Sequence, residues 1–270
     1  MSSVSFSVDQ PSTVSSSTVV KGRGITVRYG GLTALDKVDI DVAAGEVVAL
    51  LGHSGSGKST LMKSLTRMTP IEADVLNIGD TDVLSLRHHE LRPLRAQVGN
   101  IFQNFNLVPN VSALTNVLTG GLFRSGPVNR IGLFPARQRR RALELLEWVG
   151  LQDKAKQQTR TLSGGEQQRV AIARALMQEP KLILADEPVA SLDPRLAGSI
   201  LSLLRRIASE HHTPVIVSLH VVDLAHRYSD RVIGLSAGRI VHQGPSASLD
   251  EGVVKSIYGT EGEFGDETTR

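Results

Sequence analysis

Three short apolar runs constrain the fold of this chain more than any other feature. Val47–Leu51, Lys181–Ala185 and Pro214–Leu219 are apolar almost throughout, and each is followed by glycine-containing, charged or polar sequence. Such runs are typical of strands that are covered on both faces of a sheet. Helical patterns lie between the runs, and buried strands that alternate with helices predict an α/β domain with a mainly parallel sheet.

Two of the helical patterns have an apolar face that can be named. The residues expected on these faces are Leu143, Leu146 and Val149 in the first helix, and Val170, Ala173, Leu176 and Met177 in the second, which Pro180 ends. The segment from about residue 104 to residue 162 contains no strongly β-branched run, so we expect a mostly helical insertion there. Alternating residues in Ile25–Tyr29 and Val38–Val42 predict half-buried strands.

The two ends of the chain have a different composition from the middle. The first twenty residues include eight serines and no lysine or arginine, and the last dozen are rich in Gly, Glu and Thr. Such sequence buries little apolar surface, so we expect flexible tails at residues 1–21 and 259–270. One folded domain is then expected over residues 22–258.

Composition excludes several classes of protein. The chain has no cysteine, which excludes disulfide frameworks and cysteine-ligated metal sites. Its net charge of +3 comes from 30 basic and 27 acidic residues, a balance that gives no indication of nucleic-acid binding, so no nucleic-acid partner is expected. The apolar runs are far shorter than the roughly 20 residues of a membrane-spanning helix. The basic run at residues 137–141 is expected to be a solvated helix face.

The strongest chemical signal follows the first apolar run and precedes a helical pattern. It matches G-x-x-x-x-G-K-[ST], the P-loop pattern, through Gly52, His53, Ser54, Gly55, Ser56, Gly57, Lys58, Ser59 and Thr60. The glycines let main-chain N–H groups curl around phosphate oxygens, and the following helix presents its positive end to the anion. Lys58 would place a charge on the β- and γ-phosphates, and the Ser59 hydroxyl can ligate Mg²⁺. The alternative is a chance glycine-rich turn.

Two acidic residues end the second apolar run. Asp186 and Glu187 would lie on the ligand side of the sheet, at the carboxyl ends of its strands. Asp186 would hold Mg²⁺ through water, and Glu187 would act as general base on the attacking water. The alternative is a pair of solvated carboxylates.

A third motif, Leu162–Arg169, contains both a helix cap and two consecutive glycines. Ser163 and Glu166 have the spacing of a capping box. Capping does not require Gly164 and Gly165, however, and a bare helix N-terminus with serine and glycines is also an anion site. The sequence therefore predicts two phosphate-facing helix ends but only one P-loop.

The three motifs, in this order and spacing, resemble the ATP-binding subunit of ATP-binding-cassette (ABC) transporters over roughly residues 22–245. The resemblance implies a P-loop NTPase (RecA-like) core with an antiparallel β subdomain and an inserted helical subdomain. It also implies roles for four further residues: Tyr29 stacks on adenine, Gln103 reaches Mg²⁺ and the water, Asp193 crosses to a second subunit, and His220 contacts the γ-phosphate. The alternatives are strand packing for Tyr29, a surface amide for Gln103, a helix cap for Asp193 and a satisfied strand-end histidine for His220.

The resemblance further implies partners and a location. Two copies would face head to tail and sandwich two ATP molecules, with the P-loop of one copy and Ser163–Gly165 of the other on the same γ-phosphate. Separate transmembrane permease subunits would dock near Gln103 and the helical insertion, and a solute-binding protein would deliver cargo to them. The chain would then be a peripheral protein on the cytoplasmic face of the inner membrane, with ATP and Mg²⁺ as its ligands.

Finer similarity concerns the cargo. Five segments resemble the phosphonate-importer branch: Phe102–Val108, Leu114–Leu118, Gly132–Pro135, Asp186–Pro194 and Val217–His220. The expected function is the ATPase of an importer for phosphonates or related phosphorus oxyanions. The alternatives are another ABC ATPase (for a different oxyanion, an amino acid or export), a soluble ABC ATPase, or a nucleotide-gated module with little turnover. Glu187 and His220 argue against the last.

Overall fold

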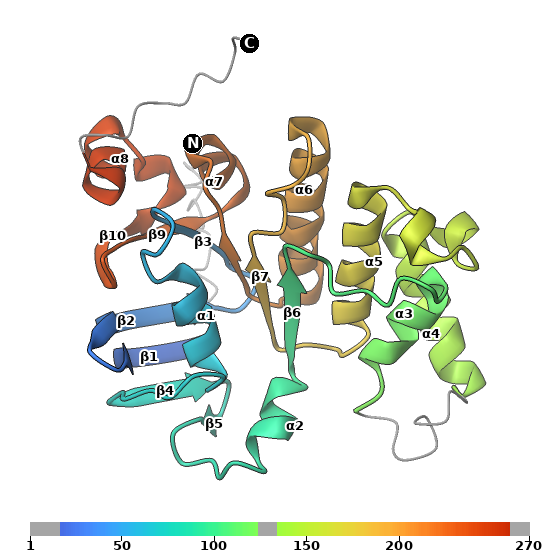
Figure 1. Cartoon of the computed structure of the whole chain (residues 1–270), viewed down its shortest axis with the longest axis horizontal. Helices are drawn as coiled ribbons and strands as arrows, with labels where there is room; N and C mark the ends of the chain where they lie inside the picture. The colour runs from blue at the N-terminus through green and yellow to red at the C-terminus, as the bar shows by residue number, and fades with distance from the viewer. Residues whose placement is uncertain (1–16, 124–133, 260–270) are drawn as a thin grey trace, which may run out of the picture.

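The computed structural model describes residues 17–123 and 134–259, which form two sheets and the helices around them (Figure 1). The larger sheet has six strands in the order β10-β9-β3-β8-β7-β6. Its members are β3 (Val47–Leu51), β6 (Val98–Phe102), β7 (Leu182–Asp186), β8 (Val215–Ser218), β9 (Arg231–Ser236) and β10 (Arg239–Pro245). All adjacent pairs are parallel except β9 with β10. The predicted α/β fold with a mainly parallel sheet is therefore confirmed.

Apolar layers cover both faces of this sheet, as the continuous apolar runs require. All five residues of β3 are buried. Val47, Ala49 and Leu51 face one apolar cluster, and Val48 and Leu50 face the other. On the second face lies α1 (Lys58–Leu65), whose Leu61 and Leu65 are fully buried.

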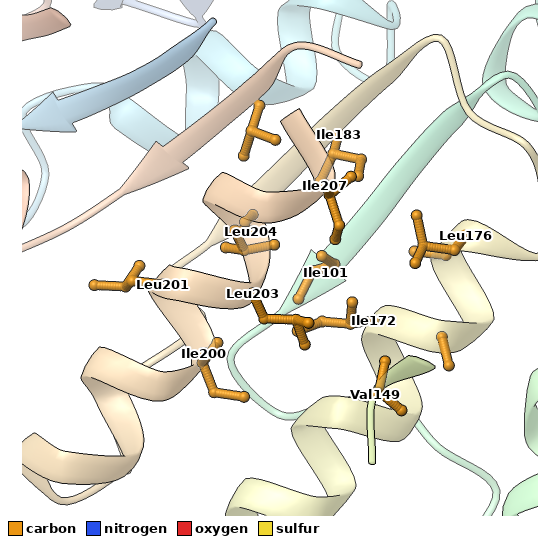
Figure 2. Close-up of a cluster of buried hydrophobic side chains, with 14 of the residues drawn as sticks. Ile101, Val149, Ile172, Leu176, Ile183, Ile200, Leu201, Leu203, Leu204 and Ile207 are labelled. Carbon is orange, nitrogen blue, oxygen red and sulfur yellow. The ribbon is translucent and has the colours of Figure 1, made fainter. Parts of the chain in front are cut away.

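The first face is covered by α5 (Gly164–Leu176) and α6 (Pro194–His211). Figure 2 shows Leu204 and Ile207 of α6 packed against Ile183 of β7 and Ile101 of β6, with Ile172 of α5 beside them. The four residues that were expected on the apolar face of the second helical pattern, in α5 and just after it, are all buried. This layer fixes the strand ends from which the chemical groups project.

A smaller antiparallel sheet has the order β2-β1-β4-β5. Its strands are β1 (Thr18–Tyr29), β2 (Leu32–Ala43), β4 (Val75–Ile78) and β5 (Thr81–Asp82). β1 begins four residues before the expected domain start at residue 22, because Thr18 pairs with Ala43 and Val20 with Ile78 in the ladder. Of the expected tails, residues 1–16 and 260–270 lie outside the described residues.

The inserted segment is helical where it is described, with α3 (Ala113–Gly120), α4 (Ala136–Trp148) and the short 3₁₀ turns η2 (Gln152–Lys154) and η3 (Thr159–Thr161). It lies beyond α5, opposite the antiparallel sheet (Figure 1). The predicted apolar face of α4 was wrong at Leu143, which is 44% exposed. Ala142, Leu145 and Leu146 are buried instead, because α4 packs on α3 and α5 through these positions and Val149. Residues 124–133, including part of the Gly132–Pro135 segment, lie outside the described residues.

The remaining helices are short: α2 (Leu91–Arg95), α7 (Val222–Tyr228), the 3₁₀ turn η4 (Ser246–Ser248) and α8 (Glu251–Tyr258). Within the two described stretches of chain, none of the helices has both the length and the apolar character that crossing a bilayer requires.

Candidate nucleotide-binding site

The glycine-rich loop leads from β3 into α1 with a backbone that only glycine adopts easily. Gly52 and Gly57 have φ angles of 148° and 110°. A Cβ at Gly52 would lie 2.3 Å from the carbonyl oxygen of Leu235, and one at Gly57 would lie 2.8 Å from Leu35 Cδ2. The loop is therefore pressed against both β2 and the end of β9, and side chains are excluded where an anion would approach its N–H groups.

Lys58 is buried at the start of α1 and is aimed back into the loop. Its Nζ donates to the carbonyl oxygens of Gly52 at 2.6 Å and His53 at 2.9 Å. Burial lowers the pKa of the Lys58 ammonium, while the charges of Glu187 and Asp186 oppose that shift. Ser56 Oγ is also buried and has no hydrogen-bond partner among the described residues. A bound phosphate would supply the acceptor that this hydroxyl lacks and a further charge partner for Lys58.

Two side chains that are distant in sequence meet beside the loop. Ser59 Oγ donates to Asp186 Oδ1 at 3.0 Å, across 127 positions of the chain. The β-strand order explains the meeting, because β3 and β7 both flank β8 and their carboxyl ends point the same way. A hydroxyl and a carboxylate oxygen so close together are the hard oxygen ligands that Mg²⁺ prefers.

Glu187 follows Asp186 in an unusual backbone conformation. Its φ is 49°, in the left-handed region, which costs a non-glycine residue about 1–2 kcal/mol. Its N–H donates to Ser218 Oγ at 2.8 Å, and its Oε1 lies 2.6 Å from His220 Nε2. The turn brings the Glu187 carboxylate to the wall of the cleft beside the P-loop. The expected catalytic pair is therefore in direct contact in this structure.

Ser218 is a residue of this site that sequence reasoning did not assign. It is fully buried at the end of β8, and its Oγ donates to Asp186 Oδ1 at 2.8 Å while it accepts from the Glu187 N–H. One hydroxyl thus holds both acidic residues. The sequence did contain a signal for this role. Ser218 lies near the end of an apolar run, and the neighbouring strand ends in two carboxylates.

We expect Ser218→Ala to lower ATP hydrolysis about tenfold and stability by about 1–3 kcal/mol, because the half-buried Glu187 N–H and Asp186 oxygen each lose a partner. Phosphate release and urea unfolding measure the two effects. Ser209→Ala, the same change at an exposed position of α6, is the matched control. Equal turnover in both variants would contradict the role of Ser218.

A cleft of about 320 Å³ lies over the loop. It is lined by Leu32, Thr33, Ala34, Ser54, Gly55, Gly57, Lys58, Ser59, Thr60, Glu187, Ala237 and Gly238. The last two belong to the β9–β10 turn, where the Gly238 N–H donates to Ser56 O. No element was predicted for this stretch from the sequence, and nothing in its residues pointed to the loop. Tyr29 ends β1 nearby and is 47% exposed, and its Oη accepts from Thr69 Oγ1.

Ser163, Gly164 and Gly165 start α5, and the capping box predicted there is confirmed. Glu166 Oε2 accepts from Ser163 N at 2.9 Å, and the other oxygen pairs with Lys154. The Lys154 bond and the Ser163 N–H together lower the pKa of the Glu166 carboxyl. Ser163 and Gly164 are exposed, and none of the three residues is among those that line the cleft in the described part of the chain. A single chain therefore does not bring this helix end to the P-loop.

The other predicted site residues stand at strand and helix ends. Gln103 follows β6 and is exposed. Asp193 Oδ1 accepts from the N–H groups of Arg195 and Leu196, so it caps α6 within its own chain. The side chain of His53 points away from the loop toward Tyr258, and its main-chain oxygen serves Lys58. The roles predicted for Gln103 toward Mg²⁺, the attacking water and a permease, and for Asp193 toward a second copy, stay predictions.

Known proteins share both the sequence and the fold of this chain. Residues 35–190 match the family described as ABC transporter. The chain is 48% identical to the Phosphonates import ATP-binding protein PhnC of Nocardia farcinica, over 89% of this chain and 90% of the relative. It is 47% identical to the Phosphate-import ATP-binding protein PhnC of Mycolicibacterium smegmatis, over 89% and 92%. A dimeric ATP-binding cassette in a post-hydrolysis state, bound to ADP and Pi, has a TM-score of 0.73 at 33% identity, over 85% of this chain and all of the other.

Proposed function

Because the chain belongs to the ABC transporter family as an ATP-binding subunit, we propose that it hydrolyses ATP to drive the import of phosphonates or a related phosphorus oxyanion. The resemblance to the phosphonate-importer branch that the motifs predicted is confirmed by these relatives. The observation that carries the proposal is the contact of Ser59 with Asp186 beside the buried Lys58. This contact brings the P-loop and the acidic end of β7, which are far apart in the sequence, into one phosphate-transfer site.

Each group of the loop has a defined task toward ATP. The N–H groups from Gly52 to Thr60 surround the phosphate oxygens, and Lys58 exchanges its bonds to Gly52 and His53 for the β- and γ-phosphates. The exposed ring of Tyr29 offers a face on which adenine stacks. The partnerless hydroxyl of Ser56 supports an anion in this loop rather than an apolar ligand.

Ser59 and Asp186 are the residues that would hold Mg²⁺, with Gln103 as a further oxygen ligand. Within residues 17–123 and 134–259 there is no cluster of three or more His, Asp or Glu side chains that would hold a metal by itself. This fits Mg²⁺, which keeps several waters and is commonly bound through one or two protein groups and substrate phosphates. The ion would neutralise charge on the β- and γ-phosphate oxygens.

Glu187 and His220 have different roles in hydrolysis: one acts on the attacking water and the other on the γ-phosphate. Glu187 accepts a proton from the water as the water oxygen attacks the γ-phosphorus, the bond from that phosphorus to the β–γ bridging oxygen breaks, and ADP leaves. His220 donates from Nε2 to a γ-phosphate oxygen. In the described chain the two side chains are bonded to each other instead. The pair must therefore part before hydrolysis, and the arriving phosphate provides the competing acceptor for His220.

The helix end at Ser163–Gly165 completes the site from a second copy. Ser163 and Gly164 are exposed, and the N-terminus of the 13-residue α5 carries unsatisfied N–H groups that suit a γ-phosphate. A head-to-tail pair would place this end over the P-loop of its partner, with Asp193 near the junction. Charge stabilisation of the transferred phosphoryl group is then complete only in the closed pair.

Transmembrane permease subunits and a solute-binding protein would turn this cycle into import. The permease would dock beside Gln103 and the helical insertion, which places the chain at the cytoplasmic face of the inner membrane. Cargo selection falls to those partners, since the cleft on this chain is taken by ATP. A relative named for phosphonate import and one named for phosphate import have nearly equal sequence identity to this chain, 48% and 47%. Sequence similarity of the ATPase therefore does not decide between these two cargoes.

A transport assay tests the proposal. The chain is reconstituted in proteoliposomes with its permease and solute-binding protein, and uptake of methylphosphonate and of inorganic phosphate is measured. We expect ATP-dependent uptake of at least one of them. ATP hydrolysis without uptake of either would contradict the oxyanion assignment, and a chain without ATP hydrolysis would contradict the function as a whole.

A further inference from the structure

The last residue of α8, Tyr258, contacts both loops that carry the reacting groups. Its Oη donates to the main-chain oxygen of His220 in a long hydrogen bond of 3.4 Å. The main-chain oxygen of Tyr258 accepts from His53 Nε2. The rings of His53 and Tyr258 meet edge to face, with centroids 5.1 Å apart. This contact also gives a reason for a histidine at a variable position of the P-loop pattern.

The sheet explains why a bridge is needed at this place. β3 and β8 pair in parallel with Leu50 opposite Ser218, and the last bond between them runs from Leu219 N to Leu50 O. Gly52 lies two residues after Leu50, and His220 lies two residues after Ser218. Beyond the ladder the strands no longer hold each other, and the P-loop and the His220 loop diverge. Tyr258 can link them, because its main-chain oxygen and ring contact His53 of the P-loop and its phenol donates to the His220 loop.

Tyr258 is itself held firmly by the core. The Asp250 side chain caps α8 by accepting from Val253 N at 2.8 Å. Ile257 is 1% exposed and fills the space over Gly234 of β9, where a Cβ would lie 2.4 Å from Ile257 Cγ1. Burial raises the pKa of the Tyr258 phenol above its ordinary value, although the nearby main chain of Gly52 opposes the shift. The phenol therefore keeps its proton, and its donor capacity, at neutral pH.

We propose that Tyr258 is a positioning residue for ATP hydrolysis, whose hydroxyl fixes the separation between the P-loop and His220. The inference rests on the proposed function. Lys58 and the loop N–H groups bind the phosphates without Tyr258, so its loss leaves ATP binding in place. The γ-phosphate contact of His220 matters most in the transition state, and a displaced His220 lowers kcat rather than affinity.

Tyr258→Phe tests the inference, because it removes the hydroxyl and keeps the ring on His53. The full chain has three tyrosines, and Tyr228→Phe on α7 is the matched control. We expect kcat to fall about three- to tenfold in Tyr258→Phe, the loss of one hydrogen bond, with the dissociation constant for ATP unchanged within about twofold. The melting temperature should match that of Tyr228→Phe. Hydrogen exchange without nucleotide should rise in peptides that cover Gly52 and His220.

Three results would overturn the inference. An unchanged kcat in Tyr258→Phe would show that the bridge has no part in turnover. Parallel losses of kcat, ATP affinity and melting temperature would show a structural role only. Unchanged hydrogen exchange at both strand ends would show that the hydroxyl does not hold them. A wild-type chain that does not hydrolyse ATP is a separate failure, that of the proposed function, and is recognised before any variant is compared.

Discussion

Replacing Lys58 by alanine is expected to lower ATP hydrolysis by about 100- to 1,000-fold, the effect of removing one preorganised charge from a phosphoryl-transfer site. Lys58 is 5% exposed and its ammonium donates to two carbonyl oxygens of the same loop, so a cation from solvent does not take its position. Its loss leaves Asp186 and Glu187 as unbalanced negative charges beside the phosphates. ATP binding also weakens, because these carboxylates repel the phosphates once the positive charge of Lys58 is gone. Phosphate release and fluorescent-nucleotide binding measure the two effects.

The control for this variant lies on the same helix. Lys63 is exposed in the last turn of α1, and Lys63→Ala makes the same chemical change away from the loop. We expect turnover in Lys63→Ala within about twofold of wild type, as for most exposed substitutions. If Lys58→Ala retained near-normal turnover beside that control, the assignment of Gly52–Thr60 as the phosphate loop would be wrong.

The second large effect is expected at Glu187. Glu187→Gln keeps the size of the side chain but removes the proton acceptor, which is worth about 100- to 10,000-fold in rate. The amide also weakens the bond to His220 Nε2, so that His220 is freer to reach the γ-phosphate. ATP should therefore remain bound while hydrolysis stops. The head-to-tail pair, which hydrolysis would reopen, should accumulate and elute as a dimer in size-exclusion chromatography with Mg-ATP.

Glu144→Gln is the matched control, because Glu144 is an exposed residue of α4 that pairs with Arg141 and is not among the described residues that line the cleft. This variant should hydrolyse ATP normally and remain monomeric once its ATP is consumed. A Glu187→Gln protein that stayed monomeric at saturating Mg-ATP would contradict the sandwich arrangement, although not the role of Glu187 as base.

Continuous apolar runs made the larger sheet predictable, since β3 and β8 are buried at every residue and only one arrangement hides such strands. The glycine-rich loop and the acidic strand end were predictable for the same reason: each is defined by neighbouring residues. The face of α4 was not, because the choice between Leu143 and Leu145 depends on where α3 and α5 lie. Periodicity alone does not fix the rotation of a helix.

The site residues that the sequence did not predict are those whose contacts lie far away in the sequence. Ser218 holds Asp186 and Glu187 from a strand that is 32 positions away from the first of them, and Tyr258 reaches His53 and His220 from the far end of the domain. The left-handed φ of Glu187 is likewise set by its bond to Ser218 rather than by its own residue type. Such contacts follow from strand order and register, which sequence patterns only outline.

The central claim is that one chain supplies half of each nucleotide site. Its most direct test is the specific ATPase activity of the purified wild-type chain at saturating Mg-ATP, measured over a wide range of protein concentration with the molecular mass followed in parallel. The account predicts that activity per chain rises with concentration and reaches a plateau as dimers form. Constant activity per chain, down to concentrations at which only monomers are present, would contradict it.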